Sequence, residues 1–391
     1  MAISGLSPME PTKEAPIIML HVGLDLSRRR LDFDVLCEDG SRLERGAVPP
    51  DADGLRGLAR RVDVFGEPVC AAIESMNGAR FVHDRLEELG WQVEIADAQK
   101  AKGLAPLACK TDRIDAWVLA ELSRRELVPS IWLPDPAVRA ERERARFRLH
   151  LVRHRTALKN RIHATLLAFG TPCPVSDLFG VAGRELLDRL EVPQPWRGTI
   201  DASLELIEDL DGQVRSCERE LRDLGADHEY VPLLMSAPGI AWVLGYTIAA
   251  EVGDIKRFDS PSKLCGYTGL CPRVYQSGER DHRGSISKNG PKYLRWAMIE
   301  AATHAVCSPV YRERYQRTAK RLGAQRGRKV ARVDIARKLT EAIWYMLTRN
   351  QPFAPAGATT PLAAWRPMSE MRRRCELRSN LIIPREDAIE R

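Results

Sequence analysis

The sequence predicts an α/β domain in the first third of the chain, then a long helical coiled-coil region and a mainly α-helical C-terminal domain. Between residues 17 and 130, short apolar runs alternate with segments of helical periodicity, the pattern of a mixed sheet flanked by helices. Pro134 and Pro136 then interrupt the chain, and longer segments of helical periodicity follow. The expected divisions are a disordered N-terminus over 1–16, an α/β domain over 17–130, a coiled-coil region over 135–226, a C-terminal domain over 229–350 and an irregular tail over 353–391.

The α/β domain is expected to begin with a strand hairpin, because only the segment from Ser27 to Arg30 separates its first two apolar runs. Asp39 and Gly40 mark the turn after this hairpin. Alternating strands and helices follow. The expected strands cover 17–26, 31–38, 69–74 and 92–96, and the expected helices cover 53–65, 79–89 and 112–127.

Four carboxylates in this domain lie within or at the end of an apolar run, or at the start of an expected helix. Asp25 interrupts the first apolar run, and Glu74 ends the third. Asp112 and Asp115 are three residues apart at the start of an expected helix, so they share one helical face. Each acid alone has an ordinary explanation, such as a helix N-cap for Asp112. Unpaired buried carboxylates are costly, however, and we therefore expect the four to converge in one pocket.

Convergence of four acids requires a counter-ion. Two unit charges about 4 Å apart repel by roughly 4 kcal/mol at an effective dielectric constant near 20, so without one some acids would stay protonated. Mg²⁺ or Mn²⁺ would remove the repulsion, since both prefer carboxylate and water oxygens. Two such ions about 4 Å apart would bind the attacking and leaving oxygens of a phosphodiester. The arrangement resembles the ribonuclease H-like (RuvC-like) fold, whose acids lie on the first strand, a central strand and a late helix.

The charge pattern favours a polyanionic partner. The chain has 391 residues, a net charge of +7 and a pI near 9.0. Residues 139–161 hold nine Arg or Lys and residues 311–338 hold eleven, whereas residues 201–223 hold eight acids. Two separate basic blocks are typical of proteins that bind nucleic acids.

Cysteine usage and the apolar segments indicate a soluble protein of the bacterial cytosol or nucleoid. The nine cysteines include no C-x-x-C pair, and the N-terminal residues lack a signal-peptide pattern. We therefore expect reduced thiols. Residues 231–250 are free of charge, but Pro232, Pro238 and two glycines interrupt them, so we do not expect a membrane span.

The central region predicts two long helices. One basic helix is expected over 137–169, with apolar positions at Ala140, Phe147, Leu151, Leu158, Ile162 and Phe169. An acidic helix follows, with a heptad seam at Ile207, Leu210, Val214, Cys217, Leu221 and Leu224. The opposite charges allow an antiparallel hairpin within the chain, and the pattern equally permits a coiled coil between chains. Residues 171–198 are expected to be mostly loop.

Residues 230–252 predict a helix, a tight turn at Pro238 and Gly239, and a second helix. Glycine permits the turn, and the free N–H groups of the second helix can face a phosphate. The pattern resembles a helix-hairpin-helix element, and a plain αα-corner is the alternative.

A glycine-rich basic segment follows, before an expected basic helical segment over 291–349. Glycines recur every six residues at 278, 284 and 290, and such glycines let backbone N–H groups approach an anion closely. Ser277, Ser285 and Ser287 offer hydroxyl groups, and spacing alone does not choose among them. A basic DNA-contacting β-hairpin without chemistry is the alternative. The candidate nucleic-acid-binding residues are Gly239, Gly278, Arg280, Arg283, Gly284, Lys288, Gly290, Lys292 and Arg295.

Over residues 18–350 the chain resembles the DEDD-type insertion-sequence transposases, a family of bridge-RNA-guided recombinases related to the Piv/MooV invertases. The motifs GLDLS (23–27), AIES (72–75) and KTDRIDA (110–116) match that family's acids, and the blocks over 236–258, 263–278 and 283–302 match its C-terminal domain. The resemblance implies that Asp25, Glu74, Asp112 and Asp115 hold Mg²⁺ or Mn²⁺. It places the serine nucleophile at Ser277. Pro291 departs from the family, which usually has a polar residue there.

The resemblance also implies a mechanism and partners. A serine would attack the scissile phosphate to form a covalent phosphoserine, and strand exchange and religation would follow without hydrolysis. A structured guide RNA would specify donor and target DNA. The working assembly would be a dimer or tetramer, in which the two halves of one active site come from different protomers.

Three other interpretations are open to the residues alone. A metal-dependent nuclease or Holliday-junction resolvase would need the four acids but not Ser277. A non-enzymatic nucleic-acid-binding protein would have no use for the acids. An actin-like or hexokinase-like ATPase would need a second phosphate loop of the Asp-x-Gly-Gly type, and the sequence has none.

Overall fold

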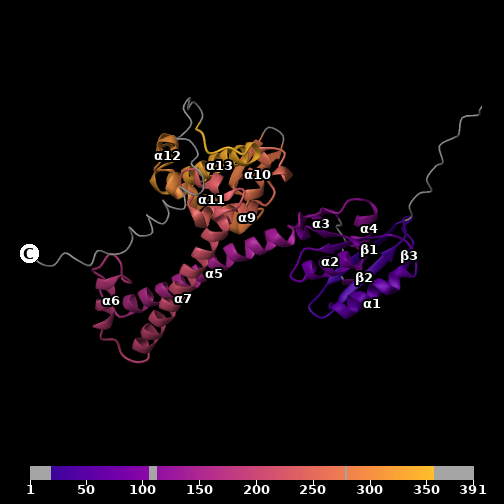
Figure 1. The fold of residues 1–391 in the computed structure, drawn as a ribbon, viewed down its shortest axis with the longest axis horizontal. Helices are drawn as coiled ribbons and strands as arrows, with labels where there is room; N and C mark the ends of the chain where they lie inside the picture. The colour runs from indigo at the N-terminus through magenta and orange to yellow at the C-terminus, as the bar shows by residue number, and fades with distance from the viewer. Residues whose placement is uncertain (1–18, 105–111, 278–279, 356–391) are drawn as a thin grey trace, which may run out of the picture. The chain divides into compact units, whose positions relative to one another are not determined.

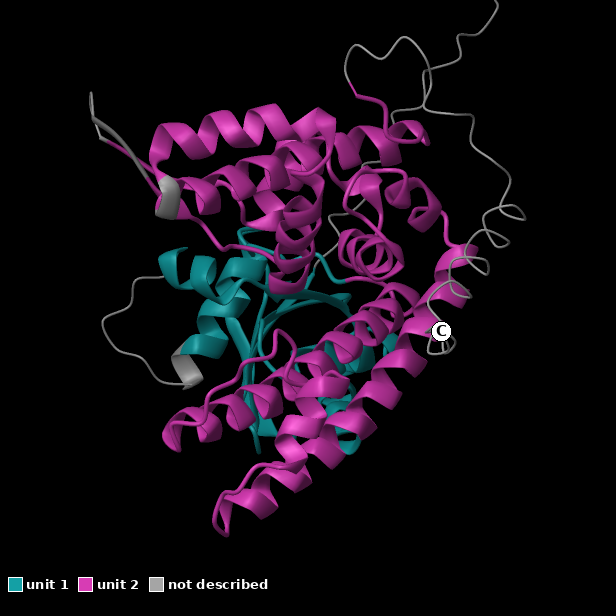
Figure 2. Cartoon of the chain, turned by 90° about the vertical axis from the view of Figure 1, so that its left-hand side faces the viewer, with its two compact units in different colours: residues 1–133 teal, residues 134–391 magenta. Residues whose placement is uncertain are grey.

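The computed structural model describes residues 19–104, 112–277 and 280–355, and within these ranges it leaves out the side chains of 112–114, 277, 280–283, 324 and 325. The chain divides into two compact units, residues 1–133 and residues 134–391 (Figure 2). Unit 1 contains the α/β elements, and unit 2 is mostly helical (Figure 1). The expected disordered segment 1–16 and nearly all of the expected irregular tail lie outside the described residues.

Unit 1 is built on a five-stranded mixed sheet with the strand order β3-β2-β1-β4-β5. β1, β2 and β3 pair in antiparallel fashion, and β1, β4 and β5 pair in parallel. The carboxyl ends of β1, β4 and β5 therefore meet at one edge of the sheet. The strands are β1 (Leu20–Leu26), β2 (Leu31–Leu36), β3 (Arg42–Val48), β4 (Val69–Glu74) and β5 (Gln92–Ala96).

Helices cover both faces of this sheet. Val22 and Leu24 of β1 belong to a core formed with α1 and α2, whereas Ala72 of β4 packs with Leu119 of α4 on the opposite face. The result is the α/β/α layering predicted from the sequence, consistent with a ribonuclease H-like domain. The helices are α1 (Ala52–Asp63), α2 (Ala79–Glu88), α3 (Ala98–Leu104) and α4 (Asp112–Arg124).

Two elements of unit 1 were not predicted. β3 is an edge strand, and all of its side chains are at least partly exposed, so it lacks the apolar alternation that reveals a half-buried strand. α3 spans only seven residues and buries only Ala101.

Unit 2 begins with two long antiparallel helices, α5 and α7, which lie side by side with α6 near their far end (Figure 1). Ion pairs join the basic helix to the acidic one, so the structure forms the hairpin within one chain. α6 lies in a segment that was expected to be loop. The helices are α5 (Pro136–Ala168), α6 (Val181–Asp188) and α7 (Trp196–Ala226), and the ion pairs are Arg144–Glu220, Arg148–Glu218 and Arg155–Asp211.

The seams of this hairpin differ in part from the prediction. On α7, Ile207, Val214 and Leu221 are buried at seven-residue intervals as expected, but Leu224 is 44% exposed. On α5, the predicted core positions Ala140, Phe147 and Phe169 are exposed, and Ala145 and Leu149 are buried instead. The predicted positions Leu151 and Ile162 are buried as expected, and Ala145 belongs to the core around α9.

The rest of unit 2 is a helical domain around α9, in which every residue from Leu244 to Val252 is buried. The two helices and the turn predicted over 230–252 are present, as is the basic helical segment, and a two-stranded hairpin lies between them. None of the helices among the described residues has the length and apolarity needed to cross a bilayer. The elements are α8 (Val231–Met235), α9 (Trp242–Val252), η1 (Ile255–Arg257), α10 (Pro261–Thr268), β6 (Pro272–Ser277), β7 (Arg280–Ile286), α11 (Lys292–Ala305), α12 (Pro309–Leu322) and α13 (Ala324–Arg349).

Candidate active site

Helix α4 crosses β1 directly above Gly23. A Cβ atom added to this glycine would lie 1.8 Å from the carbonyl oxygen of Ala116 and 2.5 Å from the amide nitrogen of Ala120. No other residue type allows the helix backbone to approach the strand so closely. Gly23 thereby fixes the height of α4 above the face of the sheet.

A buried hydrogen bond gives the direction of α4 along this face. The Nδ1 atom of His21 lies 3.1 Å from Oγ of Ser123, near the C-terminal end of the helix. Because Ala116 lies over Gly23 and Ser123 lies over His21, α4 runs antiparallel to β1. The N-terminal turn of α4 therefore points toward the carboxyl end of β1, where Asp25 is.

Asp25 and Glu74 lie side by side at this carboxyl edge. In the parallel register of β1 and β4, Gly23 faces Ala72 and Leu24 faces Ile73, so the next pair along the strands is Asp25 and Glu74. Side chains alternate between faces along a strand, so Asp25 points to the same face as Gly23. Neighbouring strands are about 4.8 Å apart. The two carboxylates therefore share the face that α4 covers.

The acids of α4 lie on its sheet-facing stripe. Asp115 is four residues before the buried Leu119, and Asp112 is four residues before the buried Ala116. Residues four apart on a helix lie above one another. The stripe that packs on the sheet thus continues as Asp112 and Asp115 toward the edge that carries Asp25, although the side chain of Asp112 is outside the described set.

The donor set fits a hard divalent cation, since all four predicted ligands are carboxylates. Within the described side chains, which exclude that of Asp112, no group of three or more His, Cys, Asp or Glu residues has the geometry to hold a metal ion. The Nζ atom of Lys102 lies 3.9 Å from Oε1 of Glu74. Lys102 is 62% exposed at its side chain, so this cation is a weak, displaceable partner for Glu74.

A buried acid next to Asp25 was not predicted from the sequence. Asp32 of β2 is the direct cross-strand partner of Asp25 and is only 5% exposed. Its Oδ1 accepts a hydrogen bond of 2.7 Å from Nη2 of Arg30. Its alternation with the apolar Leu31 and Phe33 predicts an exposed side chain, and the packing of α4 on β2 buries it instead.

In unit 2, the predicted serine lies at the end of a β-hairpin. Ser277 is the last residue of β6 and pairs with Arg280, the first residue of β7. Gly278 and the side chains of Ser277, Arg280 and Arg283 lie outside the described residues. Ser285 is exposed on β7, and Oγ of Ser287 accepts a hydrogen bond from the backbone N–H of Asn289.

The loop after the hairpin is held against α10 by tight backbone contacts. Gly290 has a φ of 91°, and a Cβ there would lie 2.0 Å from the carbonyl oxygen of Tyr267. Nη1 of Arg295 donates to the carbonyl oxygen of Lys288 over 3.1 Å. Gly290 and Arg295 therefore have internal packing roles, whereas Lys288, Lys292 and Gly284 are exposed.

Gly239 has a similar packing role. Its φ is 82°, and a Cβ would lie 2.2 Å from the carbonyl oxygen of Ala301 in α11. The turn between α8 and α9 is thus packed on α11, which explains the glycine without a bound phosphate.

A cationic cluster surrounds Tyr293 at the start of α11. The guanidinium carbons of Arg146 and Arg153 lie 5.0 and 5.5 Å from the centre of its ring, and Nζ of Lys292 lies 5.1 Å from it. These groups join the basic face of α5 to the segment predicted to bind nucleic acid.

Comparison with known protein families identifies the chain. Residues 22–170 match the DEDD-type IS110 transposase domain, which is described as a transposase, and residues 231–316 match the family described as transposase IS116/IS110/IS902. The chain belongs to the IS110/IS116/IS902 family of transposases. The first match contains the four predicted acids, and the second contains Ser277 and all of the candidate nucleic-acid-binding residues.

Curated relatives carry consistent descriptions. A transposase for insertion sequence element IS1328 from Yersinia enterocolitica is 29% identical over 73% of this chain and 86% of its own length. A transposase for element IS1111A from Coxiella burnetii is 26% identical over 73% of this chain and 79% of its own length. A pilin gene-inverting protein from Moraxella bovis is 33% identical over 31% of this chain and 38% of its own length. This IS110-family transposase is accordingly a DNA-transposing enzyme, and its DEDD domain implies a general dependence on divalent metal ions.

Proposed function

We propose that this transposase cuts and rejoins DNA strands at the ends of an insertion sequence, using Asp25, Glu74, Asp112 and Asp115 together with a nucleophilic Ser277. The observation that carries the proposal is the alignment of Asp25 and Glu74 on the face crossed by α4, whose sheet-facing stripe continues as the other two acids. Four acids in this arrangement are costly unless they hold cations. Mg²⁺ or Mn²⁺ bound there would polarise the scissile phosphate.

Ser277 supplies the nucleophile in this proposal. Its Oγ attacks the scissile phosphorus, a phosphoserine bond forms, and the bond from phosphorus to the leaving deoxyribose oxygen breaks. The hydroxyl of an exchanged strand then attacks the phosphoserine, restores the phosphodiester and releases the serine. Its place at the end of β6, opposite Arg280, supports this role, because arginine recognises phosphate oxygens.

The proposal includes a structured guide RNA and a homo-oligomer, either a dimer or a tetramer. The basic surfaces of α5, α12 and α13 suit a second polyanion besides DNA. Because the four acids belong to unit 1 and Ser277 belongs to unit 2, two protomers can each supply one half of an active site.

The second candidate is a metal-dependent RuvC-like nuclease or Holliday-junction resolvase. The α/β/α layering of unit 1 and its row of acids favour this function equally well. In that case water replaces Ser277 as the nucleophile, and no covalent intermediate forms.

Covalent trapping distinguishes the two functions. The purified protein is incubated with Mg²⁺, end-joined element DNA and a structured RNA from the element's own end, and the products are separated on a denaturing gel. We expect a protein–DNA adduct that disappears in Ser277→Ala and Asp25→Ala and persists in Ser285→Ala and Ser287→Ala. Cleaved DNA without an adduct, and equal cleavage by Ser277→Ala, would leave the nuclease as the function.

A further inference from the structure

A tight basic turn lies beside the row of acids. Ser27 to Arg30 connect β1 to β2, and both the backbone N–H and Oγ of Ser27 donate to the carbonyl oxygen of Arg30 over 2.8 Å. The turn starts two residues after Asp25, at the edge where Glu74 ends β4. The side chains of Arg28, Arg29 and Arg30 are exposed there. Positive charge is thus fixed next to the carboxylates.

Arg30 differs from its neighbours because a buried acid holds it. Nη2 of Arg30 lies 2.7 Å from Oδ1 of Asp32, whose side chain is 7% exposed, while that of Arg30 is 53% exposed. A buried carboxylate needs a charged or hydrogen-bonding partner, so Asp32 anchors the guanidinium firmly. The exposed part of Arg30 consequently has a defined position at the mouth of the site.

The strand register places this pair level with the acids. Asp32 is directly opposite Asp25, and directly opposed residues have Cβ atoms about 5 Å apart on one face. A DNA strand that reaches Asp25 and Glu74 brings a negatively charged phosphodiester to a place lined with carboxylates. A fixed guanidinium beside them can bind the non-bridging oxygens and stabilise the charge that develops in phosphoryl transfer.

A second ion pair on the same strand provides an internal control. Nε of Arg42 lies 2.7 Å from Oδ1 of the fully buried Asp34, and the side chain of Arg42 is 43% exposed. The chemistry and burial match those of Arg30 and Asp32. Asp34 is opposite Gly23 rather than Asp25, however. The Arg42–Asp34 pair therefore lies two residues, or about 7 Å, further along the strand from the carboxyl edge.

We propose that Arg30 contacts a non-bridging oxygen of the scissile phosphodiester and stabilises its transition state, and that Asp32 is the positioning residue that holds Arg30. This inference rests on the proposed cleavage function of Asp25 and Glu74. It adds a residue from the turn after β1 to a site whose other members are carboxylates. Planar, fixed guanidinium geometry is required, so lysine does not replace Arg30 fully.

The test is single-turnover DNA cleavage by the full-length protein with RNA, saturating DNA and saturating Mg²⁺. We expect Arg30→Ala to slow cleavage about 100-fold, Arg30→Lys and Asp32→Asn to slow it less, and Arg42→Ala to leave the rate within about threefold. The same variants are assayed on DNA with a neutral methylphosphonate at the scissile position. Because the contacted charge is then missing, the penalty of Arg30→Ala is expected to shrink at least tenfold.

Folding is monitored separately, since Arg30→Ala leaves Asp32 buried without this ion pair. The double variant Arg30→Ala/Asp32→Asn also removes the buried charge of Asp32. Its melting temperature and its binding of Mn²⁺ are expected to match those of the wild type, while its cleavage stays slow. Equal penalties on both DNA substrates, or an equal loss in Arg42→Ala, would overturn the inference. If Arg30→Ala cleaves DNA at the wild-type rate while Asp25→Ala is inactive, the inference is overturned but the proposed function is not. Undiminished cleavage by Asp25→Ala would overturn both.

Discussion

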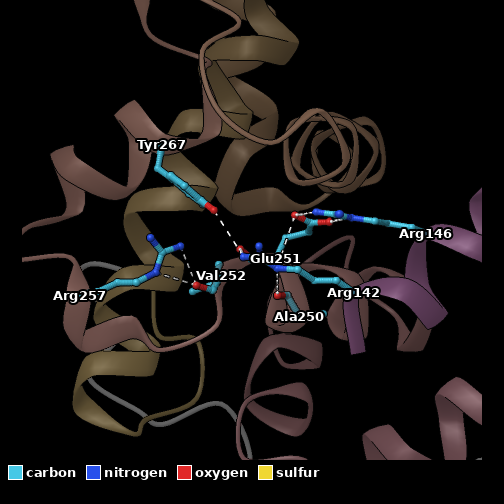
Figure 3. A network of polar contacts seen from close by, with 7 residues as sticks. All are labelled: Arg142, Arg146, Ala250, Glu251, Val252, Arg257 and Tyr267. Atoms are coloured by element: carbon cyan, nitrogen blue, oxygen red, sulfur yellow. Dashed lines mark hydrogen bonds and ion pairs between the residues drawn. The ribbon is translucent and has the colours of Figure 1, made fainter. Parts of the chain in front are cut away.

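Both carboxylate oxygens of the fully buried Glu251 are bound by the guanidinium of Arg146, whose Nε and Nη2 donate to them over 2.7 and 3.0 Å (Figure 3). Arg142, on the same helix α5, donates to the backbone carbonyls of Ala250 and Glu251 over 2.8 and 2.7 Å. Arg257 donates to the carbonyl of Val252 over 2.9 Å. Arginines thus satisfy the last carbonyl groups of α9 and complement the negative end of its dipole.

This network predicts a large loss of stability in Glu251→Gln. The variant leaves the Arg146 and Arg142 side chains near a neutral buried partner, and breaking a buried ion pair costs about 3–5 kcal/mol. Urea unfolding measures the loss. Glu313→Gln is the control, because the Glu313–Arg317 pair is exposed at 83% and 74% and its removal is expected to cost less than about 1 kcal/mol. Equal losses in the two variants would contradict a structural role for the network.

Gly23→Ala is predicted to displace α4. The added methyl group would collide with the backbone of Ala116 and Ala120, which cannot move without shifting the helix. Overpacking of this kind costs about 1–3 kcal/mol or more, and we expect cleavage to be lost because Asp112 and Asp115 move with α4. Gly57→Ala in α1 is the control, since a Cβ there meets nothing within 4 Å. Alanine stabilises a helix by about 1 kcal/mol relative to glycine. The melting temperature should therefore rise for Gly57→Ala and fall for Gly23→Ala.

Periodicity predicted most of the secondary structure of unit 1, and its limits have physical causes. The strands over 69–74 and 92–96 have the predicted bounds, because their apolar runs are buried and end at turns. β3 was missed because an edge strand needs little apolar surface. The stripe on α5 was predicted correctly at Leu151 and Ile162 but wrongly at Ala140 and Phe147, because that part of the helix packs through Ala145 on the core around α9.

For the candidate site, the sequence predicted the types of residue but not all their relations. Asp25 and Glu74 could be placed at strand ends, and the structure shows them at one level of the sheet. The role of Gly23 depends on a contact with a helix more than ninety residues later, which no local pattern contains. Asp32 was overlooked because an acid next to a turn has a ready explanation as a surface residue. Its burial follows only from the packing of α4 on β2.

Glu74→Gln is predicted to remove the effect of Mg²⁺ on stability. In the wild type, a cation that binds the folded state alone at about 100 times its dissociation constant adds about 2.7 kcal/mol. Removing one carboxylate from the row weakens that binding and also relieves repulsion between Asp25 and Glu74. We therefore expect Glu74→Gln to melt at a higher temperature than the wild type in EDTA, and to gain little when Mg²⁺ is added.

The control for this measurement is Asp51→Asn. Asp51 caps α1, and Oδ1 accepts from the backbone N–H of Gly54 over 2.8 Å. Asparagine caps equally well, so this variant should keep the full Mg²⁺ response. A Mg²⁺ response in Glu74→Gln as large as that of Asp51→Asn would exclude Glu74 as a ligand.

Two glycines of the basic loop are predicted to respond differently to alanine. Gly290→Ala forces a methyl group toward the carbonyl oxygen of Tyr267 at a φ of 91°, so we expect it to destabilise unit 2 by more than about 1 kcal/mol. At Gly284 the nearest atoms to an added Cβ lie 3.8 Å or more away, so stability should be unchanged. If Gly284 admits a DNA backbone, Gly284→Ala weakens DNA binding in an electrophoretic mobility assay. Normal binding by Gly284→Ala would instead assign that glycine to the hairpin alone.

His21 is predicted to make stability fall in mild acid. Burial beneath α4 lowers the pKa of His21 below its ordinary value near 6.5. The unfolded chain therefore binds a proton at a higher pH than the folded protein does, and the folded state loses stability as pH falls below about 6.5. Above that pH the contribution is fully present, because the imidazole is neutral in both states.

The comparison is between the wild type and His21→Gln, which cannot take up the proton but can still hydrogen-bond Ser123. Free energies of unfolding are measured at about pH 7.5 and about pH 5.5, where only titrating groups shared by both proteins should otherwise contribute. We expect the wild type to lose more stability than His21→Gln across this interval. His304→Gln is the control for replacing an exposed imidazole, since that side chain is 65% exposed. Parallel losses in the wild type and His21→Gln would show that protonation of His21 does not oppose the packing of α4 on β1.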